Sequence, residues 1–183
     1  MKRLPQILFG LMIILLAASC NKDESVWEKY KDWRNANNDF FNSKSYATTP
    51  NGQGFEYEHI TPDWDKGSFI LMKRFKDGPD QTKVPLYTST VDVMYKGMLY
   101  DGTGFDSTYL YTDSITTFRC SSTVLGFAIA LTNMAVGDSC EVIIPQYLAY
   151  GAQESGKIKP YSTLVFGIKL VGIPGYEKPV IPE

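Results

Sequence analysis

The sequence predicts an α+β domain built on an antiparallel sheet, preceded by one helix and by an export signal. Three observations predict this class. Apolar and polar residues alternate in several short runs after residue 54, which is the period of half-buried strands. In that part of the chain, only residues 124–134 carry apolar side chains at the spacing of a short helix. Because helical and extended segments do not alternate along the chain, a doubly wound parallel sheet is excluded.

Composition and charge argue against several classes of function. The chain has 183 residues, with 18 basic and 20 acidic side chains and no basic stripe, so nucleic acid is not an expected partner. It has one histidine, His59, and three cysteines that form no cluster with it, so neither a metal site nor a cofactor is expected. A nucleophilic relay would depend on His59, which lies in a polar loop or an edge strand. Any chemistry is therefore expected to use neither a metal nor an imidazole.

The first 19 residues have the parts of a secretory signal. Met1–Arg3 is basic, and Ile7–Ala18 is apolar but too short for a comfortable membrane span. The segment Leu16–Cys20, with the sequence LAASC, resembles a bacterial lipobox in which Cys20 accepts the lipid. The alternative is an ordinary signal peptide with a chance cysteine. We therefore expect residues 1–19 to be removed and the mature protein to be anchored in the bacterial envelope through Cys20, in the outer membrane.

Residues 20–65 are expected to form a tether, a helix, a loop and an edge strand. Asn21–Glu24 has a lysine followed by two acids, and it resembles the short export signal of surface lipoproteins in Bacteroidetes-type bacteria. The alternative is a plain solvated linker, so the membrane leaflet stays open. Asn42–Gly54 is rich in turn-forming residues, and Phe55–Ile60 alternates as an edge strand does.

A helix is predicted from Ser25 to about Phe41. Ser25 can cap it, and Glu28 follows three residues later, as in a capping box. Mainly aromatic side chains recur near helical spacing and form a stripe: Trp27, Tyr30, Trp33 or Arg34, Asn37, Phe40 and Phe41. This stripe is expected to dock against the domain. The alternative is a contact between two copies of the chain, so a monomer and a dimer through this helix both remain open.

The rest of the chain supplies the other elements in order. A strand is predicted over Ser68–Phe75 and a hairpin over Val91–Thr108. They are followed by a strand at Thr116–Cys120, a short helix at Val124–Met134, a strand at Ser139–Ile144, a loop at Pro145–Tyr161 and a final strand at Thr163–Ile173. The short helix is expected to lie across the sheet that these strands form.

The hairpin carries candidate chemistry. Val91 and Tyr95 belong to an alternating run, and Tyr100–Gly104 is a turn with two glycines free to adopt positive φ. Such a hairpin can bring Tyr95, Phe105 and Asp106 together at the entrance of one pocket, where aromatic side chains surround a carboxylate. From these residues alone, a hairpin whose aromatic residues merely fill the core remains an alternative.

Several separated motifs follow the hairpin. They are Val124–Phe127, Ala130–Met134, Val136–Asp138, Val142–Pro145, Leu148–Gly151, Ile158–Pro160 and Ser162–Phe166. In this order and spacing they closely resemble the FKBP family of peptidyl-prolyl isomerases. The resemblance implies an isomerase domain over residues 66–175, in which an antiparallel sheet wraps around the one short helix. Residues 176–183 would be a flexible tail.

The resemblance also implies roles for individual residues. Asp106 would lie near the carbonyl that twists, oriented by the Tyr95 hydroxyl, and Tyr150 would give its hydroxyl to a substrate carbonyl. The backbone N–H of Val124 would hold the next carbonyl. Apolar side chains would form the substrate pocket: Phe105, Phe118, Val124, Phe127, Ile158 and Phe166.

The chain departs from the family pattern at three positions. Phe127 stands where most members have the tryptophan that floors the pocket. Lys159 replaces a proline, and Thr123 replaces an aliphatic residue. These changes would alter the rate or the preference for the residue before proline, but they remove no group that the chemistry requires.

The strand order implied by the resemblance separates Cys120 from Cys140. Cys120 would lie on an edge strand and Cys140 about three strands away, which is roughly 14 Å at ~4.8 Å per strand. A disulfide needs Cα atoms within about 7 Å. Although an exported protein can form disulfides, two free and mostly buried thiols are expected.

The function that the resemblance implies is peptidyl-prolyl cis-trans isomerisation, which assists the folding of envelope proteins. The partners would be proline-containing polypeptides, and rapamycin-like macrolides would occupy the same pocket. The alternative is a proline-peptide binding or chaperone module with little catalysis, because the residues do not separate the two functions.

Overall fold

A computed structural model of the protein describes residues 24–108 and 114–176. The predicted signal peptide, the predicted lipid site at Cys20 and the segment from residue 177 onward lie outside them. Within the described residues, no helix is long and apolar enough to cross a membrane. The strands are β1 (Glu58–Ile60), β2 (Ile70–Lys76), β3 (Thr90–Leu99), β4 (Gly104–Ser107), β5 (Thr116–Arg119), β6 (Ser139–Ile144) and β7 (Leu164–Gly172). The α-helices are α1 (Val26–Lys29), α2 (Lys31–Ser45) and α3 (Leu125–Leu131).

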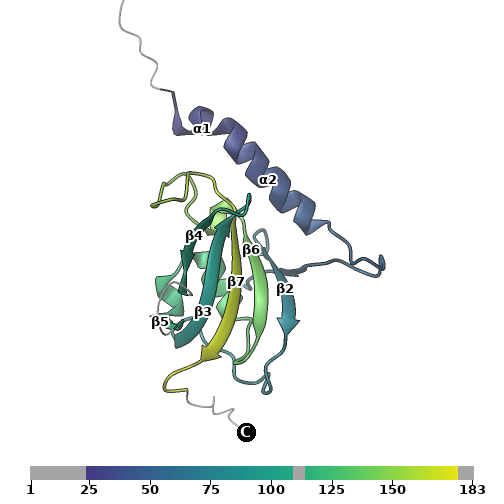
Figure 1. Ribbon diagram of the computed structural model, residues 1–183, viewed down its shortest axis with the longest axis vertical. Coiled ribbons are helices and arrows are strands. Elements are labelled where there is room, and N and C mark those ends of the chain that lie inside the picture. The colour runs from purple at the N-terminus through teal and green to yellow at the C-terminus, as the bar shows by residue number, and fades with distance from the viewer. Residues whose placement is uncertain (1–23, 109–113, 177–183) are drawn as a thin grey trace, which may run out of the picture.

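The strands of the described residues form one seven-stranded antiparallel sheet. Its order is β1-β2-β6-β7-β3-β4, and β5 also pairs with β3. The sheet curves in front of α3 in Figure 1, while α2 crosses beyond the upper ends of the strands. The predicted α+β class, with a sheet around one short helix, is confirmed.

The short helix α3 packs on one face of the sheet. Phe127, Ile129 and Leu131 are buried in the main core between helix and strands. A Cβ atom at Gly126 would collide with the side chain of Ile144 on β6, so glycine allows α3 to lie close to the sheet. Burial of each large apolar side chain here contributes about 1.5–3 kcal/mol. This packing fixes the N-terminal end of α3, which borders the site described below.

The opposite face of the sheet carries a smaller core under α2. Leu71, Ile143, Val165 and Met98 are register partners in turn on β2, β6, β7 and β3. Because side chains alternate between the two faces of a strand, this row points away from α3. Phe41 of α2 packs in the same cluster. The row therefore holds the C-terminal half of α2 against the sheet.

The N-terminal helix differs from its prediction in continuity and length. It is interrupted at Tyr30, where φ is −105° and ψ is 20°, and it continues to Ser45. At the interruption, the carbonyl oxygen of Trp27 accepts a 2.6 Å hydrogen bond from Arg34 Nη1. In a continuous helix that carbonyl would accept from the N–H of Lys31. The guanidinium of Arg34 thus replaces a backbone donor that the sequence pattern had assumed.

The two described cysteines confirm the expectation of free thiols. Cys120 and Cys140 are both buried and unpaired. Cys140 lies on β6, and Cys120 begins the 3-10 turn η2 (Cys120–Ser122) directly after β5. The sheet order β6-β7-β3-β5 places three strand steps between them. The predicted separation is therefore correct.

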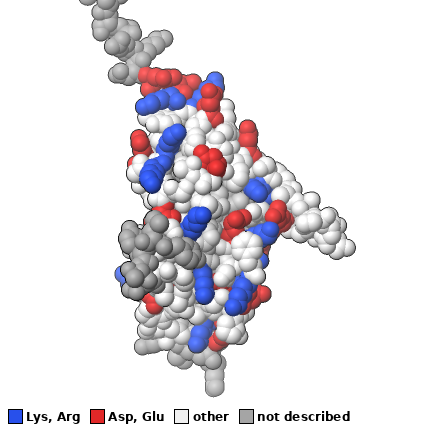
Figure 2. Space-filling model, viewed as in Figure 1, with Lys and Arg blue, Asp and Glu red and all other residues white. Residues whose placement is uncertain are grey.

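Charged side chains of both signs are interspersed over the face seen in Figure 2.

Unlike these surface charges, the side chain of Asp138 is fully buried. Its carboxylate accepts hydrogen bonds from the N–H groups of Gly78 (2.6 Å) and Ala135 (2.9 Å) and from Gln81 Nε2 (3.0 Å). Arg74 Nη1 adds an ion pair at 3.0 Å. Asp138 therefore ties the turn after β2 to the turn before β6.

Candidate functional site

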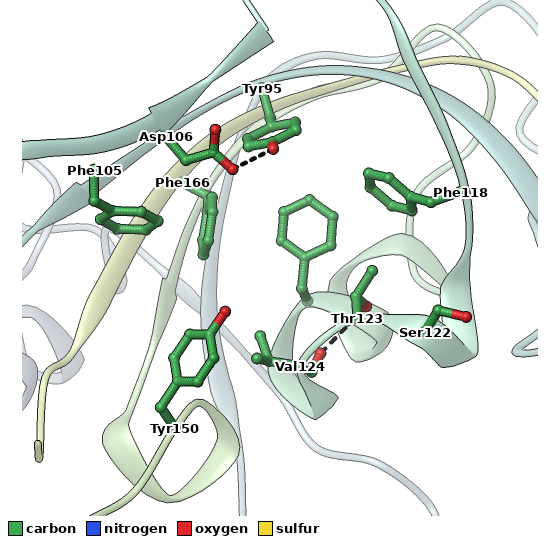
Figure 3. A pocket seen from close by; sticks show the side chains of 10 residues that line it. Tyr95, Phe105, Asp106, Phe118, Ser122, Thr123, Val124, Tyr150 and Phe166 are labelled. Atoms are coloured by element: carbon green, nitrogen blue, oxygen red, sulfur yellow. Dashed lines mark hydrogen bonds between the residues drawn. The ribbon is translucent and has the colours of Figure 1, made fainter. Parts of the chain in front are cut away.

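A cavity of about 500 Å³ opens between the β3–β4 hairpin, the N-terminal end of α3 and the loop after β6. These segments are far apart in the sequence, but β3, β7 and β6 are neighbours in the sheet. The lining side chains, drawn in Figure 3, are Tyr95, Phe105, Asp106, Phe118, Ser122, Thr123, Val124, Phe127, Tyr150 and Phe166. The lining is therefore mainly aromatic, with one carboxylate and a few hydroxyl groups.

Phe127 lies at the centre of the aromatic cluster. Its ring centroid is 4.9 Å from that of Phe166, 5.9 Å from that of Tyr95 and 5.8 Å from that of Phe118. The rings of Tyr95 and Phe166 meet that of Phe127 edge-on at 75°, an arrangement worth about 0.5–1.5 kcal/mol per pair beyond burial, and the ring of Phe118 is tilted at 60°. Phe127 is 4% exposed, so it forms a rigid apolar floor.

A hydrogen-bonded pair of polar side chains borders this floor. Tyr95 Oη donates a 2.5 Å hydrogen bond to Asp106 Oδ2, and the backbone N–H of Ser107 donates one of 2.8 Å to Asp106 Oδ1. Both carboxylate oxygens are thus engaged, although Asp106 is exposed to solvent. The backbone N–H of Tyr95 donates to Thr108 Oγ1 at 3.1 Å. The carboxylate is therefore held in one orientation at the mouth of the cavity.

Tyr150 and Val124 lie across the cavity from this pair (Figure 3). Tyr150 follows the 3-10 turn η3 (Gln146–Leu148), and its hydroxyl group points into the cavity. Val124 is the N-cap residue of α3, with φ −60° and ψ 146°. Backbone N–H groups at a helix N-terminus have no partner inside the helix. The Tyr150 hydroxyl can therefore donate to a carbonyl oxygen of a ligand, and the N-terminal end of α3 borders the same cavity.

The residues predicted from the sequence meet at this cavity, with one exception. Tyr95, Asp106 and Tyr150 line it, together with all the predicted apolar residues except Ile158. Ile158 is 4% exposed and packs in the main core. Its backbone N–H donates a 2.8 Å hydrogen bond to the carbonyl of Ser155, which closes a tight turn. Ile158 therefore packs in the core and is not among the residues that line the cavity.

Two lining residues, Ser122 and Thr123, were not among the predicted pocket residues, although Thr123 was noted as a departure from the family pattern. Ser122 is the last residue of η2, and Thr123 follows it; Thr123 Oγ1 donates a 2.8 Å hydrogen bond to the carbonyl of Cys120. Their position directly before Val124 was the available signal, since a residue that precedes a helix N-cap shares its loop. They add hydroxyl groups to the α3 side of the cavity.

The cavity suits the binding of an apolar group flanked by carbonyl groups. Among the described residues, no group of three or more histidine, cysteine, aspartate or glutamate side chains is placed to hold a metal ion. The aromatic rings can seat a compact apolar ring, and the hydroxyl and N–H donors can hold the neighbouring carbonyl oxygens. The carboxylate of Asp106 supplies a fixed negative charge at the same mouth.

Similarity to known proteins agrees with this geometry. Residues 82–171 match the model of the FKBP-type peptidyl-prolyl cis-trans isomerase family. The FKBP-type 22 kDa peptidyl-prolyl cis-trans isomerase of Escherichia coli is 43% identical over 91 residues, which are 49% of this chain and 44% of that protein. Outer membrane protein MIP of Legionella longbeachae is 41% identical over 90 residues, 49% of this chain and 38% of that protein. The chain thus spans less than half the length of these two curated relatives.

A solved structure extends the similarity beyond the matched residues. The crystal structure of a peptidyl-prolyl cis-trans isomerase from Pseudomonas syringae aligns with a TM-score of 0.62 and 28% identity. The alignment covers 79% of this chain and 95% of that one. Residues 82–171, which carry every lining residue of the cavity, are therefore a domain of the FKBP-type peptidyl-prolyl cis-trans isomerase family.

Proposed function

We propose that the protein is a peptidyl-prolyl cis-trans isomerase that assists the folding of proteins in a bacterial cell envelope. The observation that carries this proposal is the Tyr95–Asp106 pair, held at 2.5 Å beside the buried ring of Phe127. A proline ring would rest on Phe127. The Tyr150 hydroxyl and the Val124 N–H would then hold the carbonyl groups of the peptide.

The physical basis is the cost of twisting an amide. Rotation about an X-Pro bond crosses a barrier of ~18–20 kcal/mol, because twisting breaks the resonance of the amide. Resonance places negative charge on the carbonyl oxygen, and water stabilises this planar state more than the twisted one. Transfer of the bond from water into the aromatic cavity therefore lowers the barrier, and fixed dipoles that favour the twisted geometry lower it further. Neither a nucleophile nor a metal is required.

A prolyl-isomerisation assay tests the proposal. Purified protein lacking residues 1–19 would be added to peptides of the Ala-Leu-Pro and Ala-Phe-Pro types, with and without rapamycin. We expect the rate of isomerisation to rise in proportion to enzyme concentration, and rapamycin to abolish the increase because it fills the same cavity. Rates equal to the uncatalysed background at every enzyme concentration would exclude the proposal.

The same assay separates catalysis from binding alone. The cavity opens directly to solvent beside the exposed Asp106, so an extended polypeptide can enter it without a large rearrangement. A protein that binds rapamycin and proline peptides but gives no catalysis would be a binding or chaperone module. That result would leave the assigned pocket in place and change only its role.

The envelope location rests on the N-terminal sequence and on one relative. The segment Leu16–Cys20 resembles a lipobox, and the name of the Legionella relative describes an outer membrane protein. We expect mass spectrometry of the mature protein to find a diacylglyceryl group on Cys20. Cys20→Ala would release the protein from membranes. An unmodified mature N-terminus at any other residue would rule out the anchor.

A further inference from the structure

The aromatic face of α2 contacts both segments that border the cavity. One is the pocket loop, which we define as residues 145–163, and the other is the β3–β4 hairpin. Trp33 touches both of them. Its Nε1 donates a 3.1 Å hydrogen bond to Ser162 Oγ in the pocket loop, and its ring centroid is 5.0 Å from that of Tyr100 at the turn of the hairpin. One side chain of α2 thus bridges two walls of the site.

A second residue of α2 holds the end of the pocket loop. Asn37 is fully buried, and its Oδ1 accepts a 2.7 Å hydrogen bond from the backbone N–H of Thr163. The hydroxyl of Thr163 donates to the carbonyl of Asn37 at 3.3 Å, and Asn37 Nδ2 donates to the carbonyl of Trp33 at 2.8 Å. Because the side-chain oxygen and nitrogen of Asn37 both form hydrogen bonds inside the protein, this buried amide fixes the loop and the helix relative to one another.

A third contact reaches the pocket through Tyr161. This residue adopts φ 63°, a left-handed conformation that is uncommon outside glycine and persists only where the surroundings determine it. The ring of Trp27 packs edge-on against it at 5.5 Å, and the guanidinium of Arg34 lies 3.3 Å from the ring centroid of Trp27. The N–H of Tyr161 donates a 2.6 Å hydrogen bond to the carbonyl of Gly151, which directly follows Tyr150.

These contacts form a continuous path from α2 to the backbone of Gly151, the residue that follows Tyr150. We propose that Trp33, Arg34 and Asn37 are positioning residues, which hold the pocket loop so that Tyr150 points into the cavity. The inference rests on the proposed function, since it concerns the same cavity. The loop has little regular structure of its own beyond η3, so its free form would populate many conformations. Apparent affinity falls in proportion to the population of the competent one.

The test combines a binding measurement with hydrogen exchange. Trp33→Leu removes the donor to Ser162 and the ring contact with Tyr100. We expect amide exchange over residues 150–163 to rise about tenfold and the Kd of an Ala-Leu-Pro peptide to rise about fivefold, with kcat unchanged. Ser162→Ala removes the same hydrogen bond from the loop side without changing α2, together with the 2.7 Å hydrogen bond from Ser162 Oγ to the carbonyl of Lys159, so it should also raise loop exchange and Kd.

Phe41→Leu is the matched control. It shortens a buried side chain on the same helix, but Phe41 packs on Phe69, away from the loop. It should lower thermal stability and leave loop exchange and peptide affinity unchanged. In a Tyr150→Phe background, Trp33→Leu should have no further effect on Kd, because the two changes act through one hydroxyl.

The outcomes separate this inference from the proposed function. Unchanged loop exchange and Kd in Trp33→Leu, or equal effects from Phe41→Leu, would overturn the positioning role even if the protein is an active isomerase. Conversely, a wild-type protein without catalysis would refute the proposed function. The exchange measurement would still decide whether α2 holds the pocket loop.

Discussion

Asp106 and Tyr95 are joined across the hairpin, although they are not register partners. Asp106 on β4 pairs with Gly97 on β3, yet its Oδ2 accepts a 2.5 Å hydrogen bond from the hydroxyl of Tyr95, two residues before Gly97 on β3. The carboxylate therefore leans along the hairpin toward the cavity. A group fixed in this way can act on the geometry of a bound amide without moving.

The first prediction follows from this placement. Asp106→Ala should lower kcat/KM by about tenfold or more, because an interaction stronger in the twisted state than in the planar state is lost. Binding of rapamycin or of an Ala-Leu-Pro peptide should change much less. Tyr95→Phe removes only the hydroxyl that holds the carboxylate, so its kcat/KM should lie between those of wild type and Asp106→Ala. Equal isomerisation by Asp106→Ala and wild type would show that the carboxylate has no part in turnover.

The second prediction concerns the aromatic floor. Phe127→Leu should weaken peptide binding and catalysis together, since the ring would hold the proline in both planar and twisted states. Deletion of the whole ring in Phe127→Ala should also cost about 3–5 kcal/mol of folding stability, so the leucine variant is the cleaner test. Phe127→Trp should retain or raise activity if the cavity has room. A loss of kcat without a loss of binding would contradict the floor assignment.

A glycine on β3 controls the width of the cavity. A Cβ atom at Gly97 would lie 2.6 Å from ring carbons of Phe105 and 2.9 Å from Phe166. Gly97→Ala should therefore displace these rings, lower the free energy of unfolding by about 1–3 kcal/mol and reduce rapamycin affinity. Gly167→Ala on the adjacent β7 is the matched control, because no atom lies within 4 Å of its added Cβ. Similar losses in both variants would point to a general β-strand effect.

Acid should remove the contribution of Asp138 to the free energy of unfolding. Burial opposes its charge, but the hydrogen bonds from Gly78, Gln81 and Ala135 and the positive charge of Arg74 outweigh burial and lower the pKa of the carboxyl group. A carboxyl whose pKa is lower in the folded state stabilises that state above its unfolded pKa of about 3.9. The contribution is lost as pH falls through the lower, folded pKa. Urea unfolding at pH 7 and at pH 2.5 measures it.

Asp138→Asn provides the comparison for this pH effect. At pH 7 the variant should unfold at a lower urea concentration, with a loss of about 3–5 kcal/mol for a broken buried pair. The gap between wild type and variant should narrow as the pH falls from about 4 through the lower, folded pKa of Asp138, because the unfolded wild-type chain binds the proton first. A gap that stays constant over this range would mean that the charge of Asp138 adds nothing to stability.

The two buried thiols should react only slowly with alkylating reagents in the folded protein. Burial raises the pKa of Cys140 to about 11 and also raises that of Cys120, so little thiolate forms at pH 8. Iodoacetamide should modify these two cysteines slowly in the native protein and rapidly in urea, as measured by peptide mass spectrometry. A linked Cys120–Cys140 peptide in a non-reducing map would contradict both the sheet order and this prediction.

Much of the fold was predictable because strands and helices leave periodic patterns. The range predicted for β6 agrees with the structure, and Ser25 accepts a 3.3 Å hydrogen bond from the N–H of Glu28, as the capping pattern indicated. The interruption at Tyr30 was not predictable, since it depends on a side chain, Arg34, that replaces a backbone donor. The spacing of apolar residues does not reveal a hydrogen bond between a side chain and a backbone carbonyl seven residues away.

The site was predictable to the extent that it lies on regular elements. Tyr95, Asp106 and Phe127 come from a hairpin and a helix, whose geometry follows from their period. Ile158 lies in an irregular loop, where no period in the sequence indicates which way a side chain faces. The direction of a loop side chain depends on contacts with distant segments, and here those segments include the N-terminal helix.

The place of β7 in the sheet sets the order in which the protein can mature. This strand is the last in the described chain, yet it lies between β6 and β3 and carries Phe166 into the cavity. A nascent chain that ends before Leu164 would hold two separate sheet fragments, β1-β2-β6 and β3-β4-β5, with no ladder between them. Folding dominated by such distant pairings is slow. The pocket that would accelerate the folding of other chains is thus completed only after β7 has been synthesised and paired.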